Sequence, residues 1–160
     1  MSIYVSWQEF DELLLKLSEQ IRSEGVPDLI VGLQRGGLIP GVILSHKLGV
    51  RDFEAIDIRR TMTEEIDAEK MSPRLGSSVQ TERLADRDIL LVDDVAGTGV
   101  TLWTIKQLVS HCSPRRMRSL VCFLNQEKWD SADTHETSRL ISYIGKEVRG
   151  WIIFPWENRQ

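Results

Sequence analysis

The stretch Ile89–Thr101, ILLVDDVAGTGVT, decides the fold class of this chain. Its four leading apolar residues are typical of a buried strand in a parallel sheet. Asp93 and Asp94 come next, and small residues and threonines then lead into an expected helix over Thr98–His111. Amides at the start of a helix favour an anion, and threonine hydroxyls add hydrogen-bond donors. The stretch therefore predicts a strand, a phosphate-binding loop and a helix, in that order.

The two adjacent acidic residues set a condition on this interpretation. Carboxylates beside a phosphate repel it unless they bind another group. Ribose hydroxyls or a hydrated Mg²⁺ ion would be such a group. The plain alternative is that Asp93 and Asp94 only cap the helix. No GxxxxGK[ST] motif is present, so the loop is not a nucleotide P-loop. A nucleophile elbow is also missing from the sequence, so there is little support for a hydrolase or a kinase.

Apolar runs and helical patterns alternate along the rest of the chain. Ser6 and Glu9 have capping-box spacing at the start of the first helix. We expect helices over 6–24 and 38–48, strands over 28–33, 52–58, 88–92 and 117–124, and further strands or a small C-terminal cap over 141–145 and 150–154. This alternation predicts an α/β fold, with a parallel twisted sheet flanked by helices. Ligands of such sheets bind beyond the carboxyl ends of the strands, so the loops over 34–37 and 93–101 should open onto the same side.

The composition narrows the class of protein. The chain has 160 residues, which is about one domain, and we expect a single domain over 1–160. The net charge of -4 argues against a nucleic-acid partner. No apolar stretch approaches the ~20 residues that span a bilayer, so no membrane partner is expected. Cys112 and Cys122 match no common metal or redox spacing. With no secretory pattern at its start, the chain is expected to be cytoplasmic.

The segment 92–101, VDDVAGTGVT, resembles the signature by which type I phosphoribosyltransferases bind 5-phosphoribosyl-1-pyrophosphate (PRPP). The resemblance implies that Asp93 and Asp94 hold the ribose hydroxyls and a Mg²⁺ cofactor. It implies that the 5-phosphate is cradled by Ala96, Gly97, Thr98, Gly99, Val100 and Thr101. It also implies the type I phosphoribosyltransferase fold with a small C-terminal base-binding segment, and a homo-oligomer, either a dimer or a tetramer.

A second segment, Val31–Val50, is similar to the pyrophosphate-binding segment of the purine enzymes of this family, of the xanthine-guanine and hypoxanthine type. Arg35 is a cation suited to a pyrophosphate, and Gly36 and Gly37 permit a close backbone approach. In the family this turn can hold a non-proline cis peptide, which we expect next to Arg35. The alternative is an ordinary glycine turn with a surface arginine.

A third segment, Gly150–Glu157 (GWIIFPWE), resembles the base-binding end of the same purine enzymes. By that resemblance Trp151 stacks on the base, and main-chain groups at Trp151 and Ile152 read its edge. Stacking of a base on an aromatic ring contributes about 1–3 kcal/mol. The alternative is that these aromatic residues, including Phe154 and Trp156, belong to the core or to an interface.

The polar stretch Thr61–Asp86 has no sustained period and occupies the place of the family's flexible catalytic loop, which would close over the site. Ser77, Ser78 and Arg83 are candidate contacts of this loop. Arg59 or Arg60 is a secondary candidate for the pyrophosphate, after Arg35.

The sequence departs from the purine enzymes at the base end of the site. Those that act on 6-oxopurines have an acidic residue where this chain has Gly97, so the catalytic residue stays unassigned. Glu157 and Glu127 are candidate replacements, unless the acceptor needs no general base. Lys128 lies a little beyond the place of the family's lysine that binds the O6 atom of the base.

We expect an enzyme, a transferase that moves ribose 5-phosphate from PRPP to a purine or purine-like base. The products would be a nucleoside 5-monophosphate and pyrophosphate. Because of Gly97, the alternative is a catalytically weak regulatory protein of the same fold that binds nucleotides or PRPP.

Overall fold

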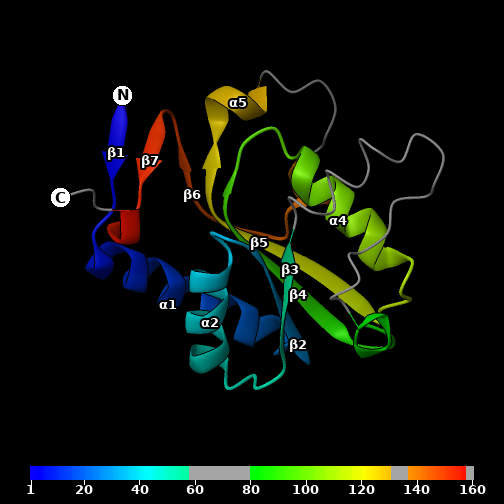
Figure 1. Cartoon of the computed structure of the whole chain (residues 1–160). Coiled ribbons are helices and arrows are strands. Elements are labelled where there is room, and N and C mark those ends of the chain that lie inside the picture. The colour runs from blue at the N-terminus through cyan, green and yellow to red at the C-terminus, as the bar shows by residue number, and fades with distance from the viewer. Residues whose placement is uncertain (58–79, 131–136, 158–160) are drawn as a thin grey trace.

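The protein is built around a parallel sheet of five strands. The structure, a computed structural model, describes residues 1–57, 80–130 and 137–157 (Figure 1). The strands lie in the order β3-β2-β4-β5-β6, and every pair is parallel. Their bounds are β2 Leu29–Gln34, β3 Phe53–Asp57, β4 Asp88–Ala96, β5 Arg116–Asn125 and β6 Tyr143–Val148. The predicted α/β class is thus confirmed.

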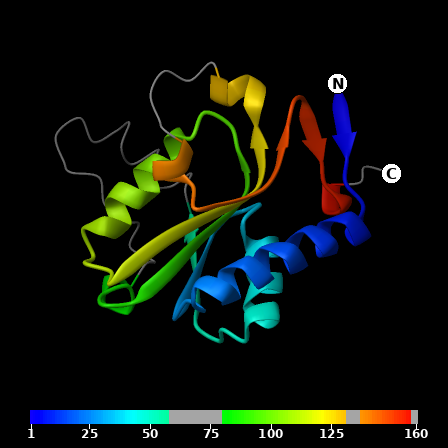
Figure 2. The same cartoon turned by 180° about the vertical axis from the view of Figure 1, so that it is seen from behind.

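Helices cover both faces of this sheet. Helices α1 (Trp7–Glu24) and α2 (Leu38–Leu48) lie on one face and α4 (Val100–Ser110) lies on the other, as the two opposite views show (Figures 1 and 2). Alternate strand residues separate two cores: Ile30 and Leu90 pack with α1 and α2, whereas Leu91 and Val121 pack with α4. This period of two is what a strand with both faces buried requires.

Local sequence signals fix the ends of the first two helices. Ser6 caps α1, since its hydroxyl accepts the Glu9 N–H at 3.1 Å and the Glu9 carboxylate accepts the Ser6 N–H at 2.8 Å. Helix α2 spans the predicted residues and ends at Gly49, whose φ of 72° is the left-handed conformation that favours glycine. Both predictions from the sequence are confirmed.

Strand β4 is longer than predicted. We expected it to end at Val92 and the acidic pair to lie in a loop, but it continues to Ala96, so Asp93 and Asp94 are strand residues. Strand β4 extends further because its two neighbouring strands pair with it over different lengths. Strand β4 pairs with β2 only as far as Val92, but it pairs with β5 up to Ala96 and Leu124. The predicted start of the next helix at Thr98 was also wrong, because α4 begins at Val100.

A second sheet of two parallel strands joins the two ends of the described chain. Strand β1 (Ser2–Tyr4) pairs with β7 (Trp151–Ile153), and the two lie side by side in both views (Figures 1 and 2). The sequence analysis predicted no strand at β1. It left 125–139 unassigned, and there the structure has α5 (Gln126–Asp130) and α6 (Thr137–Leu140). Two short 3-10 helices, η1 (Thr81–Arg83) and η2 (Pro155–Glu157), complete the described elements.

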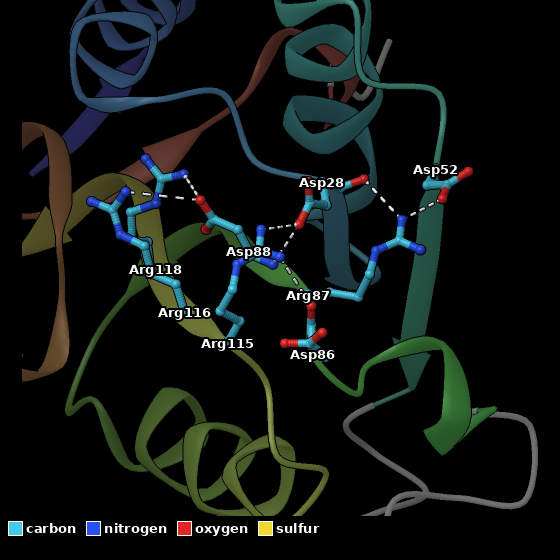
Figure 3. Close-up of polar contacts among 8 residues, drawn as sticks. All are labelled: Asp28, Asp52, Asp86, Arg87, Asp88, Arg115, Arg116 and Arg118. Carbon is cyan, nitrogen blue, oxygen red and sulfur yellow. Dashed lines mark hydrogen bonds and ion pairs between the residues drawn. The ribbon is translucent and has the colours of Figure 1, made fainter.

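Charged side chains gather at the edge where the strands of the large sheet begin (Figure 3). Arg118 is 4% exposed and donates to Asp88 at 2.9 Å and to the Tyr143 hydroxyl at 3.1 Å. Arg115 pairs with Asp28 at 2.7 Å on the more exposed side of the group. This network joins β4, β5 and β6 at the edge opposite to the carboxyl ends of the strands. No helix among the described residues is long and apolar enough to span a membrane.

Candidate functional site

The neighbouring strands β2 and β4 send their connections in opposite directions at the carboxyl edge of the sheet. The connection after β2 leads into α2 on one face, and the connection after β4 leads into α4 on the other (Figures 1 and 2). Open parallel sheets bind their ligands at such a reversal of strand order. The turn with Arg35 and the segment after Asp94 both lie there, so the prediction that they open onto one side is confirmed.

The turn after β2 lies directly against the end of β4. The Gln34–Arg35 peptide bond is cis, as predicted. A Cβ atom at Gly36 would lie 2.0 Å from Oδ2 of Asp94, and one at Gly37 would lie 2.2 Å from the carbonyl oxygen of Val92. Both distances are shorter than any real contact of a Cβ atom. The glycines are therefore required here by the approach of the chain's own groups, whereas the sequence analysis had invoked only the approach of a ligand.

The acidic pair is held by local hydrogen bonds and strained electrostatically. Oδ1 of Asp93 accepts the Asp94 N–H at 2.9 Å, and Oδ1 of Asp94 accepts the Val95 N–H at 2.8 Å. Burial and the neighbouring Asp94 raise the pKa of Asp93 well above its usual value. Burial also raises the pKa of Asp94, with a further contribution from Glu157. Two carboxylates that repel each other in a partly desolvated place are stabilised by a bound cation or by hydroxyl donors.

This pair fits the magnesium ion that the sequence analysis expected. Carboxylate oxygens are the ligands that Mg²⁺ prefers, and it is commonly bound by one or two carboxylates together with substrate phosphates rather than by a full protein cage. The described residues contain no group of three or more histidine, cysteine or acidic side chains placed to hold a metal. Asp93 and Asp94 would be its protein ligands.

The predicted phosphate cradle leads into α4. Ala96 ends β4, and Gly97, Thr98 and Gly99 connect it to the helix, which begins at Val100. Gly99 has a φ of 80°, and a Cβ atom there would lie 2.7 Å from the ring of Trp129. Glycine is therefore needed both for the backbone turn and for packing against α5. The first amide groups of a helix have no partner within it, so this connection presents donors to an anion.

A cavity of about 310 Å³ extends from the acidic pair to the C-terminal segment. Its described lining residues are Asp94, Val95, Gly97, Asn125, Lys128, Trp151, Ile152, Phe154 and Glu157. Of the predicted residues, the cavity brings together one acid of the pair, Gly97 of the loop, and both base-binding candidates. A pocket of this size suits a small organic ligand.

Comparison with known proteins settles the family. The model of the phosphoribosyl transferase domain matches residues 2–157. The chain belongs to the phosphoribosyltransferase family. It is 28% identical over 159 residues to the xanthine-guanine phosphoribosyltransferase of Cereibacter sphaeroides, a match that covers 96% of this chain and 86% of that protein.

Solved structures agree with this assignment. A purine phosphoribosyltransferase from Pyrococcus horikoshii superposes with a TM-score of 0.75 at 28% identity, covering 99% of this chain and 96% of that one. A xanthine-guanine-hypoxanthine phosphoribosyltransferase from Helicobacter pylori has a TM-score of 0.72 at 23% identity, covering 98% and 94%. This protein is thus a type I phosphoribosyltransferase that resembles the purine enzymes, an enzyme of a transferase family, and the alternative of a regulatory protein is not favoured.

The segment predicted to bind the base contains strand β7. Trp151 is 62% exposed and lines the cavity. The backbone N–H of Trp151 donates to the carbonyl oxygen of Met1 at 2.9 Å, and the backbone N–H of Val5 donates to the carbonyl oxygen of Ile153 at 3.0 Å. The stacking candidate is therefore positioned by β1, which lies far from it in the sequence.

Asn125 connects the two segments that carry Trp151 and Lys128. Its Nδ2 donates to the carbonyl oxygen of Gly150 at 2.9 Å, and its Oδ1 accepts the Lys128 N–H at 3.3 Å. The sequence analysis did not assign Asn125 a role. The only available signal was a buried polar residue at the end of an apolar strand, which is uncommon unless it is hydrogen-bonded.

The candidate general bases and the other aromatic residues of the C-terminal segment lie in different parts of the structure. Glu157 lines the cavity, and its Oε2 accepts the Phe154 N–H at 3.0 Å, whereas Glu127 is exposed and does not line it. Phe154 and Trp156 stack at 4.4 Å, and Trp156 also packs on Phe10 of α1, so this pair belongs mainly to the core.

The expected lid is described only at its end. Residues 80–86 include η1, and there Arg83 forms an ion pair with Glu54 of β3. Leu84 is fully buried, so this end is packed and not the structureless polar stretch that we expected. The candidates Arg59, Arg60, Ser77 and Ser78 lie outside the described residues.

Proposed function

We propose that this phosphoribosyltransferase transfers the ribose 5-phosphate of PRPP to a ring nitrogen of a purine or purine-like base. The products are a nucleoside 5-monophosphate and pyrophosphate, which is a salvage reaction. The observation that carries the proposal is a single cavity lined by both Asp94 and the largely exposed Trp151. A ribose bound at the acids and a base stacked on the tryptophan would meet inside it.

Each part of PRPP has a group of suitable chemistry nearby. Asp93 and Asp94 accept hydrogen bonds from the ribose hydroxyls. Donors for the 5-phosphate come from the connection made by Ala96, Gly97, Thr98, Gly99, Val100 and Thr101. The turn of Arg35, Gly36 and Gly37 binds the pyrophosphate, with the guanidinium as the cation. Asp93 and Asp94 would hold Mg²⁺, which would supply positive charge to offset that on the leaving pyrophosphate.

The protein has little covalent work in this reaction. The bond between C1 of the ribose and the pyrophosphate oxygen weakens, and positive charge develops on the sugar as in glycoside chemistry. The chain holds the ring nitrogen of the base close to C1, with the base stacked on Trp151 and its edge at the main chain of Ile152. Positioning of this kind can supply about 7–11 kcal/mol of the barrier.

Pyrophosphate release tests the proposal. The protein would be incubated with PRPP, Mg²⁺ and a panel of purine and pyrimidine bases, and each would be compared with a reaction without base. We expect release with at least one purine or purine-like base and a matching nucleoside monophosphate by chromatography. Asp94→Asn serves as the control for release that does not depend on the site. PRPP binding without turnover of any base would contradict the proposal.

The proposal has three further parts that can be tested separately. We propose that the chain acts as a single domain, that it works in the cytoplasm, and that it assembles as a dimer or tetramer. Light scattering after gel filtration measures the assembly, and imaging of the tagged protein in its host locates it. A monomer at micromolar concentration would contradict the third part and leave the transferase proposal standing.

A further inference from the structure

Helix α5 contacts both halves of the candidate site. In both views it lies between the turn from β6 to β7 and the connection from β4 into α4 (Figures 1 and 2). It follows β5 directly, and Asn125, the last residue of β5, lines the cavity. A helix in this place can set the position of the segment predicted to bind the base relative to the connection predicted to bind the 5-phosphate.

On the side of the base segment, the contact is made by the buried amide of Asn125, which is 6% exposed. Its Nδ2 donates to the carbonyl oxygen of Gly150 at 2.9 Å, and its Oδ1 accepts the Lys128 N–H at 3.3 Å, which caps the start of α5. The Gly150 carbonyl belongs to the same planar peptide group as the Trp151 N–H, which donates to Met1. That peptide is therefore held by Asn125 from one side and by β1 from the other.

On the side of the phosphate connection, two consecutive residues of α5 border its glycines. A Cβ atom at Gly97 would lie 3.2 Å from Cδ of Lys128, and one at Gly99 would lie 2.7 Å from Cζ3 of Trp129. The Trp129 side chain also packs on the core beneath α4. Gly99 directly precedes Val100, the first residue of α4. Because glycine allows many backbone conformations, a ring packed against it restricts the turn that aims the first amide groups of α4.

From these contacts we infer that α5 is a positioning element for both halves of the substrate, through two residues with separate tasks. Asn125 fixes the peptide before Trp151 and so positions the base. Trp129 fixes the turn at Gly99 and so positions the 5-phosphate. Both act through the groups that they hold and not on the reacting atoms. The inference rests on the proposed function, from which it takes the segment that binds the base and the connection that binds the phosphate.

Two ligands that differ by the base separate these tasks. Ribose 5-phosphate carries the phosphate half alone, and inosine 5-monophosphate adds a purine to the same sugar phosphate. Calorimetry gives a Kd for each ligand, and the ratio of the two isolates the contribution of the base. We expect the unaltered protein to bind inosine 5-monophosphate at least about fivefold more tightly, as a stacked base requires.

Asn125→Asp and Asn125→Ala test the base side. Aspartate keeps an oxygen that can accept the Lys128 N–H but has no donor for the Gly150 carbonyl, whereas alanine loses both bonds. Each variant should bind inosine 5-monophosphate about threefold to tenfold more weakly, as expected for one hydrogen bond, and ribose 5-phosphate within about twofold of the unaltered protein. Gln126→Glu is the matched control. This neighbouring amide donates to Glu147 at 2.7 Å and is not among the described residues that line the cavity, so neither affinity should change.

Trp129→Phe and Trp129→Ala test the phosphate side. Phenylalanine keeps a smaller ring beside Gly99, and alanine leaves the turn without support. The affinities for both ligands should fall by the same factor, about tenfold for alanine and less for phenylalanine, so that their ratio is unchanged. Trp7→Ala, at a half-exposed tryptophan of α1 on the opposite face of the sheet, is the matched control. Urea unfolding shows which variants are folded, and the phenylalanine variant carries the test if the alanine variant is not.

The pattern of the two affinities decides the inference. Unchanged binding of inosine 5-monophosphate in Asn125→Asp, or equal losses for both ligands, would overturn the task of Asn125. Unchanged binding of ribose 5-phosphate in the folded Trp129 variants would overturn the task of Trp129. These measurements need no turnover, so the expected affinities without pyrophosphate release from PRPP would overturn the transferase proposal alone. Release without the expected pattern would overturn the inference alone, and no binding of either ligand by the unaltered protein would overturn both.

Discussion

Gly36 lies directly against the side chain of Asp94: a Cβ atom at Gly36 would lie 2.0 Å from Oδ2 of Asp94 and 2.2 Å from its Cγ. The turn that carries Arg35 and the strand end that carries the acidic pair are therefore one structural unit. They are separated by more than fifty residues in the sequence, yet a change in either moves the other. The groups proposed for pyrophosphate and for ribose consequently cannot be adjusted independently.

Gly36→Ala tests this coupling. The added methyl group cannot fit beside a half-buried carboxylate, so Asp94 or the turn must shift, and a shift of about 1 Å in a positioned group can cost 10²-fold in rate. We expect PRPP affinity, measured by calorimetry in Mg²⁺, to fall at least about tenfold. Gly49→Ala is the comparison, because Gly49 lies at the end of α2 away from the turn and a Cβ atom there has no other atom within 4 Å. Equal PRPP affinity in the two variants would contradict the coupling.

The acidic pair predicts that the fold becomes more stable when one charge is removed. The pKa of Asp93 is raised well above the usual 3.8 by burial and by Asp94. A raised pKa means that the folded state binds the proton more tightly, so the contribution to stability is complete below pH 3.8 and is lost as the pH rises through the folded pKa. Asp93→Asn keeps the oxygen that accepts the Asp94 N–H but cannot ionise.

Urea unfolding at several pH values checks this expectation. Asp93→Asn should be more stable than the unaltered protein at pH 8, by on the order of 1 kcal/mol for each unit of raised pKa, and the gain should shrink toward pH 4. Saturating Mg²⁺ and PRPP should stabilise the unaltered protein and not the variant. A variant that is less stable at pH 8, with binding retained, would show that the pair is not electrostatically strained.

How much of the site could be read from the sequence depends on the range of the forces involved. Capping at Ser6 and the end of α2 at Gly49 are local, and both were predicted. The extension of β4 through Asp94 was missed, because it depends on the loss of pairing with β2 after Val92 and continued pairing with β5. The strand β1 was missed because it exists only through its pairing with β7. The spacing of the motifs indicated which residues form the site, whereas pairing between strands that are distant in the sequence positions those residues.

Gly150→Ala tests whether that long-range pairing supports the base end. Gly150 has a φ of 125°, and a Cβ atom there would lie 2.5 Å from the carbonyl oxygen of Met1, which accepts the Trp151 N–H. The substitution is therefore strained and should displace Trp151. We expect KM for the base to rise at least about fivefold, less than the full contribution of a stacked base, and PRPP affinity to stay within a factor of two. An unchanged KM for the base would show that β1 does not position Trp151.

Replacing Arg118 should lower the free energy of unfolding without affecting the candidate site. Arg118 is buried at the edge opposite to the carboxyl ends of the strands, where it donates to Asp88 (Figure 3) and to the Tyr143 hydroxyl. Arg118→Met keeps the apolar stem but leaves Asp88 with the more distant Arg116, at 3.8 Å, as its remaining cation among the described ion pairs. Removing one partner of a buried pair costs about 3–5 kcal/mol. We expect the free energy of unfolding in urea to fall by about that amount.

Arg115→Met is the matched control for this variant. Arg115 directly precedes β5 and pairs with Asp28, but both side chains are exposed, so its loss should cost no more than about 1 kcal/mol. Because the network lies at the far end of the strands from Asp94 and Trp151, kcat/KM at a temperature where both variants are folded should stay within about twofold. A loss for Arg118→Met no larger than that for Arg115→Met would mean that burial of the ion pair adds nothing to stability, and a selective loss of kcat/KM would mean that the two edges of the sheet are coupled.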